Sequence, residues 1–141
     1  MKCDMVDEID EKIVNALKEN SRKSNVQIGS AVGLSEGAVR NRIQALINSG
    51  TIRKFTIEVA PSIRVRSLTM ISVDPSSPTY AISKKVESLS GIESIYEVTG
   101  EYDIVCVVSQ RNIEGLNQTI EEIRKLDGVV KTNTVIVLRT L

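Results

Sequence analysis

The sequence predicts an α+β fold with two domains, residues 1–60 and 61–141, because two patterns of apolar residues follow one another. Up to Gly50, apolar residues recur at the three- and four-residue intervals that are typical of helices. Beyond Pro61, runs that alternate like strands enclose two more helical stretches. Because a chain of 141 residues fills at most two small cores, we expect copies of the chain to associate.

Three helices are predicted for the N-terminal domain. The first spans Asp7 to about Asn20, and acidic side chains fill its first turn, where the helix dipole favours negative charge. A short second helix spans Val26 to about Val32 and ends at Gly33, which suits a left-handed C-terminal position. Ser35 caps a third helix, which repeats apolar side chains on one face: Val39, Ile43, Leu46 and Ile47.

The chain then changes to strand-like patterns. Thr51–Val59 alternates apolar and polar residues and is predicted to be a strand. The second domain follows with a strand at 63–73, a helix at 79–89, strands at 92–98 and 104–108, a helix capped by Asn112 and a strand at 129–138. This β-α-β-β-α-β order is typical of a ferredoxin-like domain. Its helices would cover one face of an antiparallel sheet and leave the other face for a second subunit.

The composition disfavours several classes of protein. There is no histidine, and the two cysteines, Cys3 and Cys106, have no metal-ligand spacing around them, so we expect no metal and no cofactor. The absence of histidine also removes the commonest general base, and no catalytic residues are predicted. No apolar run is long enough to span a membrane, and the N-terminus is polar and acidic, so we expect a cytoplasmic protein.

The charge is neutral overall but unevenly distributed. Residues 21–66 carry eight basic and two acidic side chains, whereas the segments before and after them are each net acidic by three charges. A basic segment between acidic ones provides the local positive potential that phosphate groups require. The central segment is therefore predicted to bind nucleic acid.

The basic segment coincides with a helix-turn-helix pattern, in which Gly33-Leu34-Ser35 forms the turn between the second and third helices. The third helix would lie in the major groove of double-stranded DNA, with Arg and Asn as the residue types suited to guanine and adenine. A solvated three-helix domain with ordinary surface charges is the alternative. The predicted contacts to bases and their surroundings are Ser35, Glu36, Gly37, Ala38, Arg40, Asn41 and Gln44, and those to phosphates are Arg22, Lys23, Arg42, Arg53 and Lys54.

Motifs in this order along nearly the whole chain resemble the Lrp/AsnC, or feast/famine, family of regulators. They are Glu8-Ile9-Asp10, Val32-Gly33-Leu34-Ser35, Gly50-Thr51-Ile52, and Thr99 with Gly100, Glu101, Tyr102 and Asp103. The resemblance implies a winged helix-turn-helix domain and a RAM domain (regulation of amino acid metabolism). It also implies homodimers formed through the sheets of the RAM domains, which often assemble into octamers or other multiples.

The resemblance further implies that a free amino acid binds between RAM domains. The effector would lie beside a loop formed by Thr99, Gly100, Glu101, Tyr102 and Asp103, with Thr132 and Thr134 from a neighbouring subunit. A glycine lets backbone amides approach a carboxylate closely, and Asp103 offers an acceptor to an ammonium group. The alternative is a plain hairpin turn, in which Gly100 supplies a positive φ and Asp103 caps the turn.

The leading hypothesis is a sequence-specific regulator of amino-acid metabolism that responds to a small amino acid. The segment from Arg53 to Ile57 is most similar to archaeal members, some of which regulate lysine synthesis, and lysine is a weak guess for the effector. An architectural DNA-binding protein of low specificity is the first alternative. The second alternative is a tetrapyrrole decarboxylase, because some similar proteins have that activity. It is disfavoured because such enzymes are thought to use histidine, which this sequence lacks.

One departure from the family pattern is Gly29, where alanine is usual, and this glycine weakens a helix unless close packing requires it.

Overall fold

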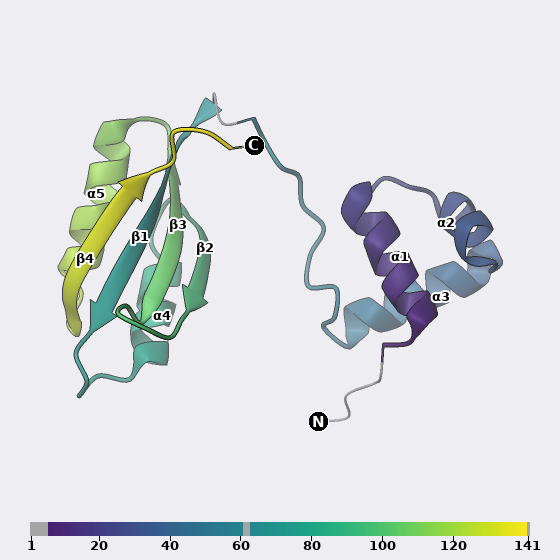
Figure 1. Ribbon diagram of the computed structural model, residues 1–141, viewed down its shortest axis with the longest axis horizontal. Helices are drawn as coiled ribbons and strands as arrows, with labels where there is room; N and C mark the ends of the chain where they lie inside the picture. The colour runs from purple at the N-terminus through teal and green to yellow at the C-terminus, as the bar shows by residue number, and fades with distance from the viewer. Residues whose placement is uncertain (1–5, 61–62, 141) are drawn as a thin grey trace. The chain divides into compact units, whose positions relative to one another are not determined.

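A computed structural model describes residues 6–60 and 63–140 of the chain. Contacts divide it between Glu58 and Val59 into two compact units, which Figure 1 shows in purple to blue and in teal to yellow. Among the described residues, no helix is both long and apolar enough to cross a membrane.

The first unit contains the three predicted helices: α1 (Glu8–Glu19), α2 (Asn25–Val32) and α3 (Glu36–Asn48). Each helix contributes one side chain that is at most 1% exposed, namely Ile13, Ile28 and Val39, and these three form the centre of the core. On α3 the predicted apolar face is buried at Val39 and Leu46 and partly buried at Ile43, but Ile47 is 39% exposed. A core this small is sensitive to the loss of any one of these contacts.

The helix ends follow the caps in the sequence. The Ser35 hydroxyl accepts the amide of Ala38 at 3.2 Å, as expected of an N-cap, and Gly33 ends α2 at φ 76°. Two capping boxes were not anticipated: Asp7 with Asp10 begins α1, and Ser24 with Gln27 begins α2. Ser24 moves the start of α2 one residue before the predicted Val26.

The strand predicted over Thr51–Val59 is wrong. Within residues 6–58, the structure has three helices and no strand, so the wing expected from the family resemblance is not formed in this single chain. The alternation is present, but Phe55, Ile57 and Val59 are 51%, 81% and 53% exposed. A strand needs a neighbour to satisfy its backbone groups, and no such neighbour lies in this unit.

The second unit has the predicted β-α-β-β-α-β order. Its elements are β1 (Val65–Val73), α4 (Thr79–Glu87), β2 (Ile92–Glu97), β3 (Ile104–Gln110), α5 (Ile113–Arg124) and β4 (Val129–Ile136). The sheet has the order β2-β3-β1-β4, and every neighbouring pair is antiparallel. This order confirms the predicted α+β class. The observed ends of the strands and helices differ from the predicted ends by no more than two residues.

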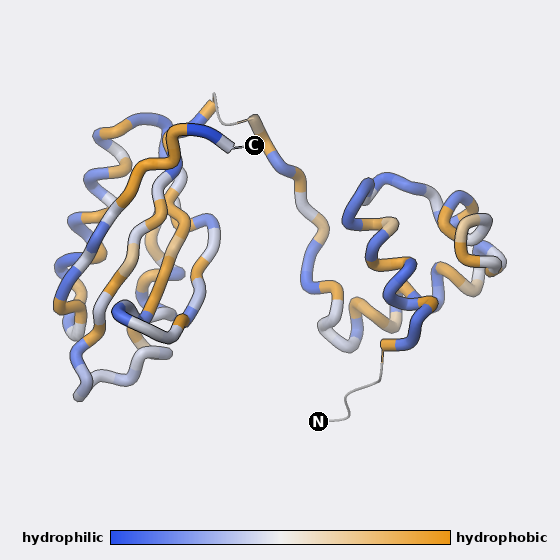
Figure 2. Tube along the Cα trace, viewed as in Figure 1, coloured by the Kyte–Doolittle hydropathy of each residue, from blue (hydrophilic) through white to orange (hydrophobic). Residues whose placement is uncertain are grey.

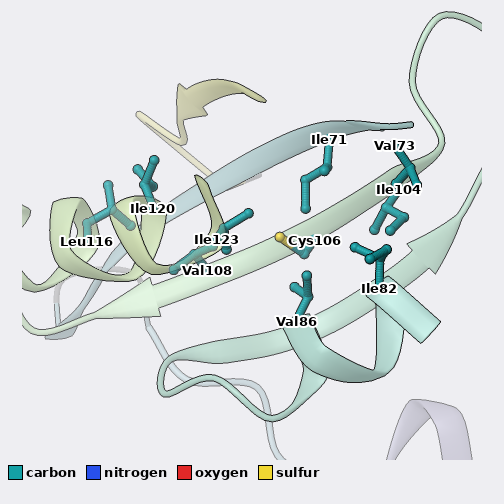
Figure 3. Packing of buried hydrophobic residues seen from close by; sticks show 10 residues of the cluster. All are labelled: Ile71, Val73, Ile82, Val86, Ile104, Cys106, Val108, Leu116, Ile120 and Ile123. Carbon is teal, nitrogen blue, oxygen red and sulfur yellow. The ribbon is translucent and has the colours of Figure 1, made fainter. Parts of the chain in front are cut away.

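The two helices cover one face of this sheet, as Figure 1 shows. β3 is a nearly continuous apolar run in Figure 2, and its Cys106 lies among Ile71, Val86 and Ile123 in Figure 3. Cys106 is fully buried, and this burial raises the pKa of its thiol to about 11. Cys106 therefore acts as a small core side chain. Cys3 lies outside the described residues.

Gly29 is explained by the close approach of α2 to the turn before α3. A Cβ atom at this position would lie 2.4 Å from the carbonyl oxygen of Leu34, which is closer than a carbon and an oxygen can come. The backbone of Leu34 is also hydrogen-bonded to α2, because its amide donates to the carbonyl of Gly29 at 3.0 Å. The glycine thus sets the spacing between α2 and the helix that follows.

We expect Gly29→Ala to destabilise the first unit by about 1–3 kcal/mol, because the backbone must move to admit the methyl group. Gly37→Ala is the matched control: a Cβ there meets nothing within 4 Å, so the better helix former should stabilise by up to about 1 kcal/mol. Amide hydrogen exchange of α2 and α3 measures both effects. Equal exchange in the two variants would contradict this packing argument.

An ion-pair cluster joins α1 to α3. Nη1 of Arg42 lies 2.7 Å from Oδ2 of Asp7 and 2.8 Å from Oδ1 of Asp10. The pKa of Asp7 is held below its ordinary 3.8 mainly by the Asp10 amide and next by Arg42, and Asp10 and Asp7 raise the pKa of Arg42. Arg42 is therefore a tie between the first and third helices.

Because the folded state lowers the pKa of Asp7, ionised Asp7 contributes stability at pH values above 3.8, and this contribution is lost as the pH falls through the lowered value. We predict that acid weakens the hydrogen-exchange protection of α1 between pH 5 and pH 2, roughly. In Asp7→Asn, which keeps a good N-cap without the charge, protection should be lower near neutral pH and this acid-dependent part should disappear. An unchanged pH profile in Asp7→Asn would show that the cluster does not stabilise α1.

Candidate DNA-binding and effector sites

The outer side of α3 is a polar surface from Glu36 to Gln44. Val39 and Leu46 face the core, which turns five of the predicted contact residues to solvent. Ala38 is half-buried, so only part of its methyl group is available to a ligand. The exposed predicted residues are Glu36, Gly37, Arg40, Asn41 and Gln44, with Ser35 exposed beside them as the N-cap.

The arginines on α3 have different surroundings. Arg40 is 64% exposed, and its Nη2 donates to Oε1 of Glu36 one turn earlier. Arg42 is half-buried and held by Asp7 and Asp10 on α1, so its charge is already neutralised within the unit. Arg42 is predicted as a phosphate contact from the density of basic residues alone. That density does not take into account the carboxylates of Asp7 and Asp10, which bind Arg42 in the fold. The acidic first turn of α1 was the signal that could have revealed this pair.

The other predicted phosphate contacts lie away from α3. Arg22 is exposed in the turn between α1 and α2, and Lys23 lies next to it with its Nζ 2.9 Å from Oε2 of Glu19. Arg53 and Lys54 are exposed in the extended segment that follows α3. All four belong to the first unit, and three of them have no acidic partner among the described ion pairs.

The predicted effector loop, 99–103, connects β2 to β3, and one end of it is fixed to β1. Oδ2 of Asp103 accepts the amide of Val73 at 2.7 Å, and the amide of Asp103 donates to the carbonyl of Ile71 at 3.0 Å. The Asp103 side chain therefore ties the end of the loop to β1 and does not cap the hairpin turn, and its contact with an effector stays a prediction. Gly100 has φ +119°, which L side chains rarely adopt, and a Cβ there would meet nothing within 4 Å. The space above Gly100 is open.

Two residues of β4 approach this loop and were missed by the sequence analysis. Nδ2 of Asn133 donates to the hydroxyl of Tyr102 at 3.4 Å, and Nζ of Lys131 lies 3.6 Å from Oε1 of Glu101 and 5.7 Å from the centre of the Tyr102 ring. Their signal was the alternation of β4, which places odd-numbered residues 131 and 133 on one face of the sheet.

Thr132 and Thr134 lie on the opposite face of the sheet. The Thr134 hydroxyl is 3.0 Å from that of Thr69, and the Thr132 hydroxyl accepts from Nε of Arg124 at 3.0 Å. The structure therefore does not bring these two threonines together with the loop within one chain. Their contact with the loop of a neighbouring subunit stays a prediction.

Comparisons with known proteins agree with both parts of this arrangement. A family model described as the AsnC-type helix-turn-helix domain matches residues 6–47, and one described as the Lrp/AsnC ligand binding domain matches residues 67–141. The transcriptional regulator LysM of Saccharolobus solfataricus is 44% identical over 135 residues, which cover 96% of this chain and 95% of LysM. Ptr1 of Methanocaldococcus jannaschii, also named a transcriptional regulator, is 36% identical over 140 residues, covering 96% of this chain and 94% of Ptr1.

A solved structure is similar over the same extent. A feast or famine regulatory protein from M. tuberculosis, complexed with L-methionine, has a TM-score of 0.83 and 27% identity, covering 96% of this chain and 93% of that one. The relatives are named as transcriptional regulators and not as enzymes. The chain is thus a regulator, and it belongs to the Lrp/AsnC family.

Proposed function

We propose that this protein is a sequence-specific DNA-binding regulator of amino-acid metabolism in the cytoplasm, and that a small amino acid alters its DNA binding. The observation that carries this proposal is the polar outer side of α3, where Arg40, Asn41 and Gln44 are exposed directly after a capped turn. These residue types form the paired hydrogen bonds that distinguish base edges in the major groove.

The contacts divide by role. Gly37, Arg40, Asn41 and Gln44 would face base edges, whereas Arg22, Lys23, Arg53 and Lys54 would contact phosphates and set the register of α3 on the duplex. We assign Arg42 a positioning role, because Asp7 and Asp10 already bind it. This division favours a specific regulator over an architectural protein, since the latter needs phosphate contacts but no base-reading face.

The protein is proposed to act as a homodimer formed through the sheet. The face of the sheet opposite α4 and α5 has no cover from the described residues of the second unit, and three large apolar side chains on it, Leu68, Tyr96 and Val135, are 39%, 56% and 45% exposed. A contiguous apolar surface is stable when a second copy covers it. Two copies would present two α3 helices to a two-fold symmetric site, and further assembly to octamers would add sites.

The effector is proposed to bind at the 99–103 loop. Within the described chain, the amides of Gly100 and Glu101 donate to no other group, and the open space above Gly100 lets a carboxylate approach them. Glu101 is the more accessible acceptor for an ammonium group, because its side chain is 73% exposed beside Lys131, whereas the Asp103 carboxylate is half-buried and bonded to Val73. L-methionine in the M. tuberculosis relative supports an amino acid as the ligand class, and lysine remains the guess for this chain.

We expect the wild-type protein to prefer a fragment of its own promoter over a scrambled duplex at two salt concentrations. One member of a panel of twenty amino acids should change this affinity. Asn41→Ala should weaken promoter binding by about tenfold, since a lost bidentate base contact costs that much. Binding is measured by fluorescence anisotropy of labelled duplexes.

The matched control is Asn117→Ala, which removes an exposed asparagine from α5 and should leave the affinity unchanged. Equal, strongly salt-dependent binding to both duplexes would favour the architectural alternative. A promoter preference that no amino acid shifts would keep the DNA-binding part of the proposal and remove the effector part.

The proposed dimer predicts a second outcome. Leu68→Lys places a charge in the middle of the uncovered sheet face and should shift the protein to monomers in analytical ultracentrifugation. Leu138→Lys is the control, because Leu138 is 96% exposed beyond the end of β4 and should leave the assembly as it is. If Leu68→Lys sediments as wild type does, another surface forms the oligomer.

A further inference from the structure

The acidic residue at the start of α3 is unexpected on a surface that meets DNA. Glu36 is the first residue of the helix, its side chain is 49% exposed, and it stands among the proposed base contacts, where phosphates repel a carboxylate. Stabilisation of the helix dipole explains an acid in the first turn, but it does not require this acid to bind Arg40. The Glu36 carboxylate nevertheless accepts a hydrogen bond from the Arg40 guanidinium.

We propose that Glu36 and Arg40 act as one unit that reads a single G·C base pair in each half-site. The inference rests on the proposed function, since it concerns the same face of α3. Glu36 holds the guanidinium over the outer surface of the helix, and Arg40 donates from its remaining N–H groups to O6 and N7 of guanine. The second carboxylate oxygen of Glu36 accepts from the amino group of the paired cytosine.

The hydrogen bonds of the two side chains allow both contacts at once. A guanidinium has five N–H donors, and the described contacts of Arg40 include only the one from Nη2 to Oε1 of Glu36. The other carboxylate oxygen, Oε2 of Glu36, has no partner among those contacts. A pair that is already formed in the free protein also lowers the entropy that Arg40 loses when it meets a base.

Gly37 provides the space for this contact. It lies beside Glu36 on the exposed side of α3, its φ is not in the left-handed region, and a Cβ there would meet nothing within 4 Å. The fold therefore does not require this glycine, although glycine weakens a helix. Unlike Gly29, which packing requires, Gly37 leaves open space beside the helix backbone that a base edge could occupy. A missing side chain lets the backbone come close to a base edge.

Specificity and affinity depend differently on Glu36. With Glu36 present, Arg40 is held away from phosphates and contributes to binding only where the base pair fits. Without it, the freed arginine adds a positive charge that any sequence can bind. Glu36 therefore lowers non-specific affinity and raises the ratio of specific to non-specific binding.

The test begins with selection of duplexes from a random pool by the full-length wild-type protein. The selected duplex and all its single-base-pair variants are then bound by wild type, Glu36→Gln and Arg40→Lys. Glu121→Gln is the matched control, because Glu121 on α5 also accepts from an arginine, Arg124, at 2.7 Å and its loss changes the net charge equally. Far-ultraviolet circular dichroism shows that each variant is folded.

We expect wild type to lose about tenfold or more in affinity when one G·C pair in each half-site is replaced. Both α3 variants should lose this discrimination and keep it at the other positions. Glu36→Gln should also bind a scrambled duplex about threefold more tightly, with a salt dependence steeper by roughly one phosphate contact. Glu121→Gln should behave as wild type.

Three results would overturn the inference. The first is that Glu36→Gln discriminates at that G·C pair as strongly as wild type does. The second is a gain in non-specific affinity in Glu121→Gln as large as that in Glu36→Gln, which would be an effect of net charge alone. The third is selection of no preferred sequence by wild type, which would remove the proposed function as well; the first two leave that function intact.

Discussion

The close contact between α2 and the turn before α3 is the constraint on which the first unit depends. Only a glycine at position 29 permits the carbonyl of Leu34 to lie where it does, and Ser35 follows immediately as the cap of α3. This backbone contact therefore sets the spacing between α2 and the turn from which α3 leaves. Val39 and Leu46 then turn the helix so that its polar side faces outward. A surface proposed to read bases must be held rigidly, and a close backbone contact at its start favours that.

The charges of the first unit are balanced in a way that total charge does not reveal. The basic excess of residues 21–66 includes Arg42, which Asp7 and Asp10 bind, and Arg40, which Glu36 binds. The carboxylates of Asp7 and Asp10 thus bind Arg42 between α1 and α3, whereas Glu36 binds Arg40 on the outer side of α3. Such an arrangement reduces attraction to phosphates in general and leaves recognition to geometry. The second unit complements this with a loop and an uncovered sheet face that suit a ligand and a second copy.

Most helices and strands could be predicted from the sequence, because apolar periodicity and helix caps depend on residues that are close together along the chain. The helices around Ile13, Ile28 and Val39 and the β-α-β-β-α-β order follow from the spacing of apolar residues. The alternating pattern at Thr51–Val59 predicted a strand that is not formed. Alternation concerns the side chains only, whereas a strand also needs a neighbouring strand to bind its backbone groups. The carboxylates that bind Arg42 lie 35 and 32 residues away, and the amide that Asp103 binds lies 30 residues away. Local spacing does not identify such pairs, although the acidic first turn of α1 is a signal of possible partners for Arg42. The threonines of β4 were assigned without knowing which face of the sheet they occupy.

The outer side of α3 is proposed to be the surface that meets specific DNA. Amide hydrogen exchange of the full-length protein, with and without a fragment of its own promoter, tests this most directly. We expect new protection across residues 36–44, with a smaller effect at Arg22 and Lys23 and no protection of α4 or α5. Protection confined to the second unit, or spread equally when a scrambled duplex replaces the promoter fragment, would contradict it.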